Sequence, residues 1–250
     1  MEHGFLLAGD GSFTTFEAPG AGAAAGQGTE VFAINDAGGV TGRYVDANAI
    51  NHGYVRAANG NITTFDAPGA GSGGARKGTI GSGINSAGAI AGWYTDGANV
   101  DHGYVRANTG TFTTFEAPGA GSASAQGTIA WAINSAGVIV GWYYDSASLA
   151  HGFVRASDGA ITTFDPSGSA GTFPSAINSA GTITGEYNDA GGVAHGFIRR
   201  TSGAITAFDV PGSGAANGQG TYPNGINKSG DIAGYSENSG NVAHGFVRTP

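Results

Sequence analysis

One sequence unit recurs along almost the whole chain. The triplet His-Gly-(Phe/Tyr) begins at residues 3, 52, 102, 151, 195 and 244, at intervals of 49, 50, 49, 44 and 49 residues. A Thr-Thr-Phe-like element ends at residues 16, 65, 115, 164 and 208, and an Ile-Asn pair ends at residues 35, 85, 134, 178 and 227. Self-similarity at this period is typical of propellers and other repeat folds.

Each copy contains four short segments that are rich in β-branched and aromatic residues. In the third copy these are TIAWAIN, VIVGWYYD, HGFVRA and AITTFD, with turn residues between them. No segment has apolar residues at helical spacing, so we expect almost no helix. The pattern predicts an all-β fold, a five-bladed β-propeller of four-stranded antiparallel blades. We expect one domain over residues 1–250, with a linear β-array as the alternative.

Every length difference between copies falls in one Gly-, Ala-, Ser- and Pro-rich segment, which follows the Thr-Thr-Phe element. A variable segment of this composition indicates a surface loop. It is the longest connection in the repeat, so we predict that the Thr-Thr-Phe strand is outermost in each blade. The strand that ends in Ile-Asn is then innermost.

The chain contains six His-Gly-aromatic segments, whereas five blades need only five such strands. We expect the N-terminal segment to supply outer strands to a blade whose inner strands come from the C-terminus, which removes exposed sheet edges. One copy, at His3 or at His244, is then surplus. The surplus strand can hang on the closing blade or mediate self-association with another chain.

The turn after the His-Gly-aromatic strand predicts the strand register. A tight turn centred on Asn59-Gly60 would place Tyr54 opposite Phe65 and Arg56 opposite Thr63. The resulting aromatic pair would stabilise the sheet by up to about 1 kcal/mol.

The repeated polar residues are expected to be structural. All six histidines lie in the repeat, and we predict hydrogen bonds to an Asp six residues earlier, at Asp46, Asp96, Asp145 and Asp189. A ring of histidines could bind a metal, but symmetric copies lie on separate blades, so we predict neither a metal site nor a cofactor. Asp46 and Asn48 vaguely suggest a calcium loop, which ordinary Asx turns explain equally well.

Positions that break the repeat are the candidate functional residues, because a binding site requires asymmetry. Flat aromatic rings beside polar groups suit sugars and other small polar ligands, although packing between blades is the alternative role for tryptophan. The candidate ligand-binding residues are Trp93, Trp131, Trp142, Arg43 and Tyr235. Glu30 and Glu186 are the non-repeated acids and the weak candidates for catalysis.

Composition and charge exclude several classes of protein. There is no Cys, so disulfides and thiol chemistry are absent. A net charge of −8 with only ten basic residues argues against nucleic acid as a partner. The sequence contains no run of about 18 apolar residues, so no membrane span is predicted. The N-terminal residues MEHGFLLAGDG do not have the pattern of a signal peptide.

The elements HGFVRA, TTFDAPGA, AINSAG and IVGWY resemble the bacterial HAF-type extracellular-repeat family over essentially the whole chain. Gly replaces the family's usual Ala after His. The resemblance implies propeller-like repeats and export, hence an extracellular or cell-surface location. It implies no particular activity and no catalytic residues.

These observations favour a binding or interaction propeller that recognises carbohydrate or another cell-surface polymer. A glycan-processing hydrolase or lyase with acids near the axis is one alternative. A purely structural repeat module of a larger surface protein is the other.

Overall fold

The computed structural model describes all 250 residues, Met1–Pro250, and contains 21 β-strands and no helix. The absence of helix agrees with the sequence, and the structure therefore has no helix that could cross a membrane. The chain divides into two compact units. Unit 1 comprises residues 1–116 and 122–130, and unit 2 comprises residues 117–121 and 131–250. The single domain over residues 1–250 stays a prediction.

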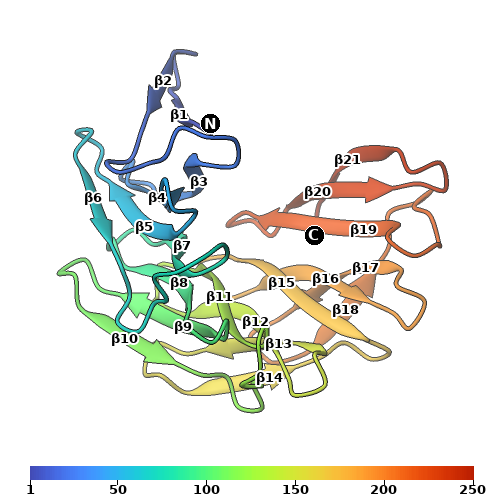
Figure 1. The fold of residues 1–250 in the computed structure, drawn as a ribbon. Coiled ribbons are helices and arrows are strands. Elements are labelled where there is room, and N and C mark those ends of the chain that lie inside the picture. The colour runs from blue at the N-terminus through green and yellow to red at the C-terminus, as the bar shows by residue number, and fades with distance from the viewer. The chain divides into compact units, whose positions relative to one another are not determined.

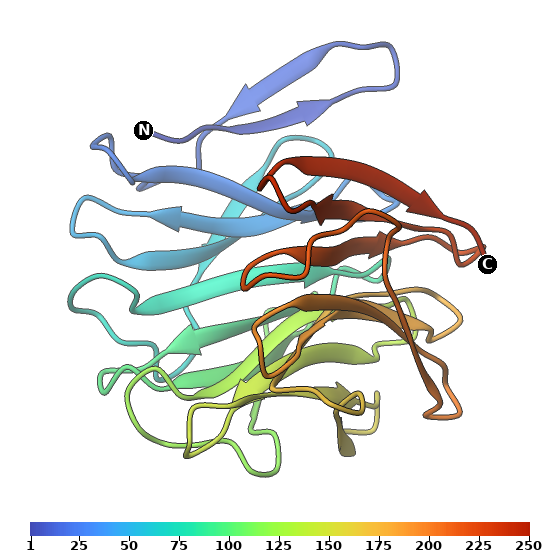
Figure 2. The ribbon, with the colours of Figure 1, turned by 90° about the vertical axis from the view of Figure 1, so that its right-hand side faces the viewer.

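The four segments of each copy form four strands in the predicted order (Figures 1 and 2). The strands that end in Ile-Asn are β3 (Gly28–Ile34), β7 (Gly78–Ile84), β11 (Gly127–Ile133), β15 (Gly171–Ile177) and β19 (Gly220–Ile226). The second strands are β4 (Val40–Val45), β8 (Ile90–Thr95), β12 (Ile139–Tyr144), β16 (Ile183–Asn188) and β20 (Ile232–Glu237).

The His-Gly-aromatic segments form the third strands, and the Thr-Thr-Phe segments form the fourth. The third strands are β1 (Gly4–Leu7), β5 (Asn51–Arg56), β9 (Asp101–Arg106), β13 (Ala150–Arg155), β17 (Ala194–Arg199) and β21 (Ala243–Arg248). The fourth strands are β2 (Phe13–Phe16), β6 (Ile62–Phe65), β10 (Phe112–Phe115), β14 (Ile161–Phe164) and β18 (Ile205–Phe208).

Pairing within a copy is antiparallel, and the fourth strand is at the outer edge as predicted. In the first full copy β3 pairs with β4, β4 with β5, and β5 with β6. At three of the four junctions between full copies, a single parallel residue pair joins the third strand of one copy to the first strand of the next, as between Asn51 and Gly78. The sheets are therefore mixed rather than purely antiparallel.

The junction between copies depends on glycine. Gly78 has a φ of +107°, and a Cβ atom built on it would lie 1.9 Å from the carbonyl oxygen of Asn51. Only a residue without a side chain allows the two backbones to approach this closely. Gly127 and Gly220 occupy the same position with the same constraint.

The predicted register of the outer hairpin is wrong by one residue. Phe65 lies opposite Gly53, and Tyr54 lies opposite Thr64. The amide of Ala57 donates to the carbonyl of Asn61, which leaves three loop residues, and the last of them is Gly60 with a φ of +94°. A three-residue loop that ends in a left-handed Gly shifts the register by one relative to a two-residue turn.

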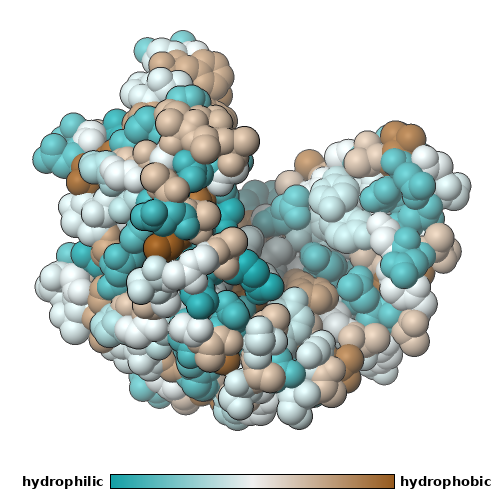
Figure 3. Space-filling model, in the orientation of Figure 1, coloured by the Kyte–Doolittle hydropathy of each residue, from teal (hydrophilic) through white to brown (hydrophobic).

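Aromatic residues of the third strands fill the core. Tyr54, Tyr104, Phe153 and Phe197 have no exposed surface. The two tyrosine hydroxyls are satisfied, because Tyr54 donates to the carbonyl of Glu30 at 3.0 Å and Tyr104 donates to that of Ile80 at 2.9 Å. The core therefore anchors the third strand to the first strand of its own copy. On the face drawn in Figure 3, strongly apolar residues are scattered among polar ones.

The Ile-Asn pair has a role that the sequence did not indicate. The side-chain oxygen of Asn178 accepts hydrogen bonds from the amides of Ala180 and Thr182, which closes the hairpin turn. Its side-chain nitrogen donates to the carbonyl of Asn227 in the next copy, at 3.1 Å. Asn35 makes the same two kinds of contact in unit 1, where it reaches Asn85. The Asn side chain therefore joins neighbouring copies as well as shaping a turn.

Candidate functional site

A cavity in unit 2 gathers residues that differ between copies. Its volume is about 350 Å³. It is lined by Trp131, Trp142, Phe173, Pro174, Ser175, Glu186 and Asn224. Among the residues predicted from the sequence, Trp131, Trp142 and Glu186 therefore lie together.

Two features of the repeat bring these side chains to one place. Trp142 and Glu186 occupy the same position of the second strands β12 and β16, so they are neighbours in successive copies. Ser175 and Asn224 lie at β-bulges, where the register of β15 and β19 shifts by one residue. A bulge leaves one residue unpaired and redirects its side chain. Trp131 has the corresponding position in β11.

Aromatic rings form one wall of the cavity. The rings of Trp131 and Trp142 are 5.3 Å apart and inclined by 43°, and Phe173 meets Trp142 edge-on at 5.8 Å. Such tilted and edge-on pairs are the favoured geometries for aromatic side chains. The indole Nε1 of Trp142 is buried and has no hydrogen-bond acceptor, an arrangement that costs stability.

Glu186 places a carboxyl group against this wall. It pairs across the sheet with Phe173 on one side and Gly196 on the other. Burial raises the pKa of Glu186 from its ordinary 4.5 to about 7, and a hydrogen bond from its own backbone N–H only partly opposes this. No ion pair compensates its charge, so near neutral pH the group exists in both protonation states.

Tyr222 and Tyr235 stack beside the cavity. They are directly opposite each other in β19 and β20, with ring centroids 4.7 Å apart and an angle of 11° between the planes. Burial raises the pKa of both hydroxyls, and the charge of Glu186 raises them further. Tyr235, a predicted ligand-binding residue, does not line the cavity itself but lies within electrostatic reach of its carboxyl group.

The other predicted residues lie in unit 1. Glu30 and Arg43 are opposite each other in β3 and β4 and form an ion pair at 2.7 Å. They line a second cavity of about 500 Å³ together with Glu2, whose pKa is raised by a hydrogen bond with Glu30 and by its charge. Trp93 is half-buried in β8, between Ile80 and Gly103 of the neighbouring strands.

The histidines have carboxylate partners, but the closer partner differs from the predicted one. The Nδ1 atom of His52 lies 2.9 Å from Asp66, the acid that follows the Thr-Thr-Phe strand. The predicted Asp46 is 3.7 Å from Nε2 on the other side of the ring. His52 also stacks on Tyr44 at 4.8 Å. The arrangement recurs in four successive copies, which indicates a structural role.

Asp46 forms an Asx turn. One of its carboxylate oxygens accepts hydrogen bonds from the amides of Asn48 and Ile50, at 2.9 and 2.8 Å. In no part of the structure do three or more His, Asp or Glu side chains come together in an arrangement that could hold a metal ion.

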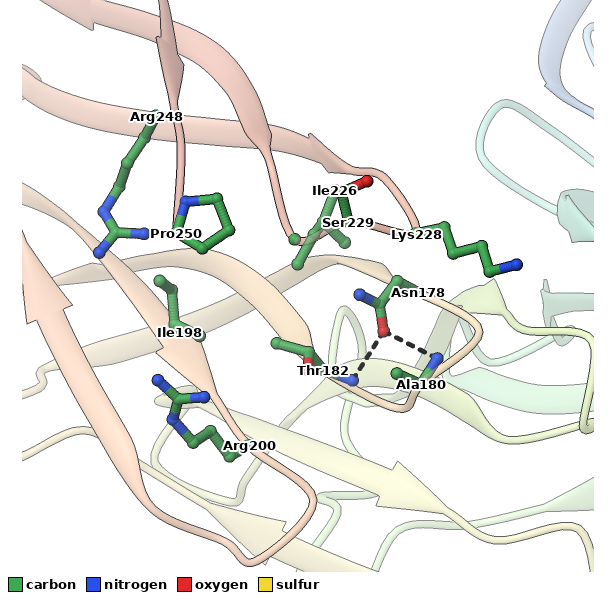
Figure 4. A pocket seen from close by; sticks show the side chains of 11 residues that line it. Asn178, Ala180, Thr182, Ile198, Arg200, Ile226, Lys228, Ser229, Arg248 and Pro250 are labelled. Carbon is green, nitrogen blue, oxygen red and sulfur yellow. Dashed lines mark hydrogen bonds between the residues drawn. The ribbon is translucent and has the colours of Figure 1, made fainter.

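A further cavity in unit 2, of about 250 Å³, contains basic side chains (Figure 4). Arg200 and Arg248 line it from the ends of two third strands, and the side chain of Lys228 points away from them. The oxygen of Asn178 is used by its own turn, as the dashed lines show. This cavity lacks the aromatic wall of the first one.

Sequence reasoning found the positions of this site but not its whole membership. Four further residues differ between copies in the sequence but were not among the predicted site residues, which included all three tryptophans. They are Phe173, Ser175, Asn224 and Tyr222. Pro174 was missed. The position of Phe173 in the repeat could have identified it. The residue after the repeated Thr of the first strand lies opposite the residue that Glu186 occupies in the second strand.

Comparison with solved structures places the fold among propeller-like proteins. A streptogramin B lyase superimposes with a TM-score of 0.59 and 15% identity, over 97% of this chain and 74% of that protein. The selenomethionine-substituted virginiamycin B lyase from Staphylococcus aureus superimposes with a TM-score of 0.56 and 17% identity, over 98% of this chain and 76% of that protein. No protein-family model matches the sequence, and no curated protein matches it. At these identities the likeness concerns the fold alone.

Proposed function

We propose that the five copies build five four-stranded blades of one β-propeller. The constant strand order in every copy and the two superimposable structures support this architecture. We further propose that the copies are HAF-type repeats and that the protein acts outside the cell or at its surface. The repeated residues would then form the scaffold, and the residues that differ between copies would carry the function.

We infer that the protein binds carbohydrate, or another cell-surface polymer of similar chemistry, in the aromatic cavity of unit 2. The observation that carries this inference is the gathering of Trp131, Trp142 and Phe173 around one carboxyl group. All of these positions differ between copies, so the scaffold does not require aromatic rings there.

The chemistry of a sugar matches the two kinds of lining group. One face of a pyranose ring carries C–H groups, which stack on an indole, while its hydroxyls need donors and acceptors. The amide of Asn224 supplies both. The hydroxyl of Ser175 donates to the carbonyl of Pro223 at 2.6 Å, so toward a ligand it offers an acceptor. Glu186 can donate when protonated and accept when ionised. The volume of about 350 Å³ lies within the range of small-ligand sites.

A glycan array tests this function. Wild-type protein is expected to bind a defined class of glycans, and Trp142→Ala is expected to lose that binding, since stacking on the central ring of the wall disappears. Leu149→Ala, a substitution of an exposed residue elsewhere in unit 2, is the matched control and should bind as wild type does. Absence of binding to any glycan, or equal binding by Trp142→Ala, would contradict the proposal and favour a purely structural role.

A lyase is the second candidate function, and the pKa of Glu186 is the observation that favours it. A group with a pKa of about 7 is suited to accept a proton from carbon and later to release it. In such an elimination the C–H bond breaks, a C=C bond forms, and the departing oxygen leaves with the electrons of its bond to carbon and takes up a proton. Two structures of similar fold are lyases.

Hydrolysis by two acids has less support, because Glu30 is held in its ion pair with Arg43 and no second carboxyl lines the cavity. The test is incubation of the bound glycan with wild-type protein, followed by ultraviolet detection of an unsaturated product. Glu186→Gln should abolish product formation while the glycan still binds. Product formation by Glu186→Gln, or no product from wild type, would remove this candidate.

A further inference from the structure

The aromatic cavity of unit 2 contains an acid and no base. Glu186 is its one ionisable lining residue, and no Arg, Lys or His lines it. Phe173 of β15 and Gly196 of β17 lie opposite Glu186 in the neighbouring strands. The titratable groups that respond to its charge are the hydroxyls of Tyr222 and Tyr235. When ionised, the carboxyl group therefore has no cation beside it in the cavity, a state that costs free energy.

The first copy shows what the same pair of strand positions holds when a base is present. Glu30 and Arg43 lie opposite each other in β3 and β4, and their side chains form an ion pair at 2.7 Å. The guanidinium carbon of Arg43 also lies over the ring of Phe32, 5.9 Å from its centre. A carboxylate and an aromatic ring thus hold one cation, since both attract positive charge.

In the fourth copy the corresponding pair is Phe173 and Glu186. The acid is on the second strand instead of the first, and a ring rather than a base lies opposite it. Trp131 occupies in β11 the position that Phe32 occupies in β3, and it lines the same cavity. The cavity therefore has the two kinds of group that hold Arg43 in unit 1, without a cationic side chain of its own.

The rings and the carboxyl group can be reached by a ligand. Trp131, Trp142, Phe173 and Glu186 are each half-buried. The rings are tilted or edge-on rather than stacked face to face, so they do not fully cover one another's faces. The face of an aromatic ring attracts a cation that lies within about 6 Å of its centre. A charged group that enters the cavity can therefore contact the rings and the carboxyl group together.

We propose that the ligand of this cavity carries an ammonium group, which pairs with the carboxylate of Glu186 and packs against the rings of Trp131 and Trp142. The inference rests on the proposed function, because it names the chemical group that this site recognises. Among carbohydrates it selects those with a free amino or a trialkylammonium group over neutral ones. The net charge of −8 favours the approach of such a ligand.

Binding of a cation at this site depends on the ionisation of Glu186. Burial raises the pKa of Glu186 to about 7, so about a tenth of the carboxyl groups are ionised at pH 6 and about nine-tenths at pH 8. Burial also raises the pKa of Tyr222 and Tyr235, whose hydroxyls stay neutral over this range. A ligand with a permanent positive charge should therefore bind about tenfold more tightly at pH 8 than at pH 6.

Isothermal titration calorimetry with choline and 3,3-dimethyl-1-butanol tests the proposal. The two molecules have the same shape, but the alcohol has a carbon atom in place of the nitrogen, so only choline is charged, and its charge does not change with pH. Wild type is expected to bind choline about tenfold more tightly at pH 8 than at pH 6. At pH 8 it should bind the neutral alcohol more weakly than choline, by roughly tenfold or more.

Glu186→Gln is the matched variant, since it keeps the shape of the side chain and removes its charge. It should lose both the preference for choline and the pH dependence, while circular dichroism shows an unchanged fold. Asp158→Asn removes a carboxylate from an exposed turn of the same unit, and this control should bind choline as wild type does. The pH series on wild type requires no variant and tests the same point independently.

Three results would overturn the proposal: equal affinity for choline and the neutral alcohol, equal binding of choline by Glu186→Gln and wild type, or no binding of choline by wild type. The glycan array separates these results from failure of the proposed function. Neutral glycans that bind through Trp142, without binding of choline, would overturn the ammonium group and leave carbohydrate binding in place. Binding of choline without binding of any glycan would support the ammonium group and remove carbohydrate as the ligand.

Discussion

Replacing Glu186 by Gln tests whether the aromatic cavity resists ionisation of its carboxyl group. Burial raises the pKa of Glu186 from 4.5 to about 7. Between pH 4.5 and about pH 7, Glu186 of the folded chain holds a proton that the unfolded chain has released. The stability of the wild type must therefore fall as the pH rises through this window. A pKa change of one corresponds to about 1.4 kcal/mol, so the whole loss is roughly 3 kcal/mol once the pH exceeds 7.

Gln keeps the shape of the side chain and stays neutral, so the variant does not share this loss. Urea unfolding at pH 4 and pH 8 measures the difference in the free energy of unfolding between the variant and wild type. The free energy of unfolding of Glu186→Gln relative to wild type should rise by roughly 3 kcal/mol between the two pH values. Trp142→Phe, a change in the same cavity that removes no titrating group, should alter stability equally at both. A difference between Glu186→Gln and wild type that does not vary with pH would refute the reasoning.

Three further predictions concern the scaffold and are measured by urea unfolding. Tyr104→Phe leaves the buried carbonyl of Ile80 without its donor and should lower the free energy of unfolding by about 1–3 kcal/mol; no loss would show that the hydroxyl is dispensable. Gly196→Ala places a methyl group against the ring of Phe208 and should lower the free energy of unfolding by about 1–3 kcal/mol; an unchanged free energy would contradict a requirement for Gly at this contact. Burial alone would lower the pKa of His151, but Asp165 and Asp145 outweigh it and raise the pKa. The free energy of unfolding of wild type should therefore exceed that of His151→Gln by more at pH 6 than at pH 8, because the contribution of the charged histidine is lost as the pH rises through its folded-state pKa. An equal difference in free energy at both pH values would contradict that contribution.

The periodic part of the sequence predicted the strands well. Strand order, the outer position of the Thr-Thr-Phe strand and the absence of helix all follow from spacings that recur in every copy. The register of the hairpin around Gly60 was wrong, because the sequence does not distinguish a two-residue turn from a three-residue loop that ends in Gly. The closer acid partner of His52, Asp66, lies 14 residues away, directly after the next strand, and only the register of that strand reveals it.

The candidate site was predictable only in part. Trp142 and Glu186 are one repeat apart at equivalent positions, so their adjacency follows from the period. The directions of Ser175 and Asn224 depend on bulges that no sequence pattern marks. The raised pKa of Glu186 also needs the structure, because burial by neighbouring copies causes it.

The central claim is that a few aromatic residues that differ between copies form a ligand site on a repetitive scaffold. Nuclear magnetic resonance of ¹⁵N-labelled tryptophan measures this most directly, with signals assigned through Trp131→Phe and Trp142→Phe. During titration with a glycan that the protein binds, the indole signals of Trp131 and Trp142 should both shift and saturate at the same ligand concentration. Saturable binding of the glycan with neither signal displaced would contradict the account.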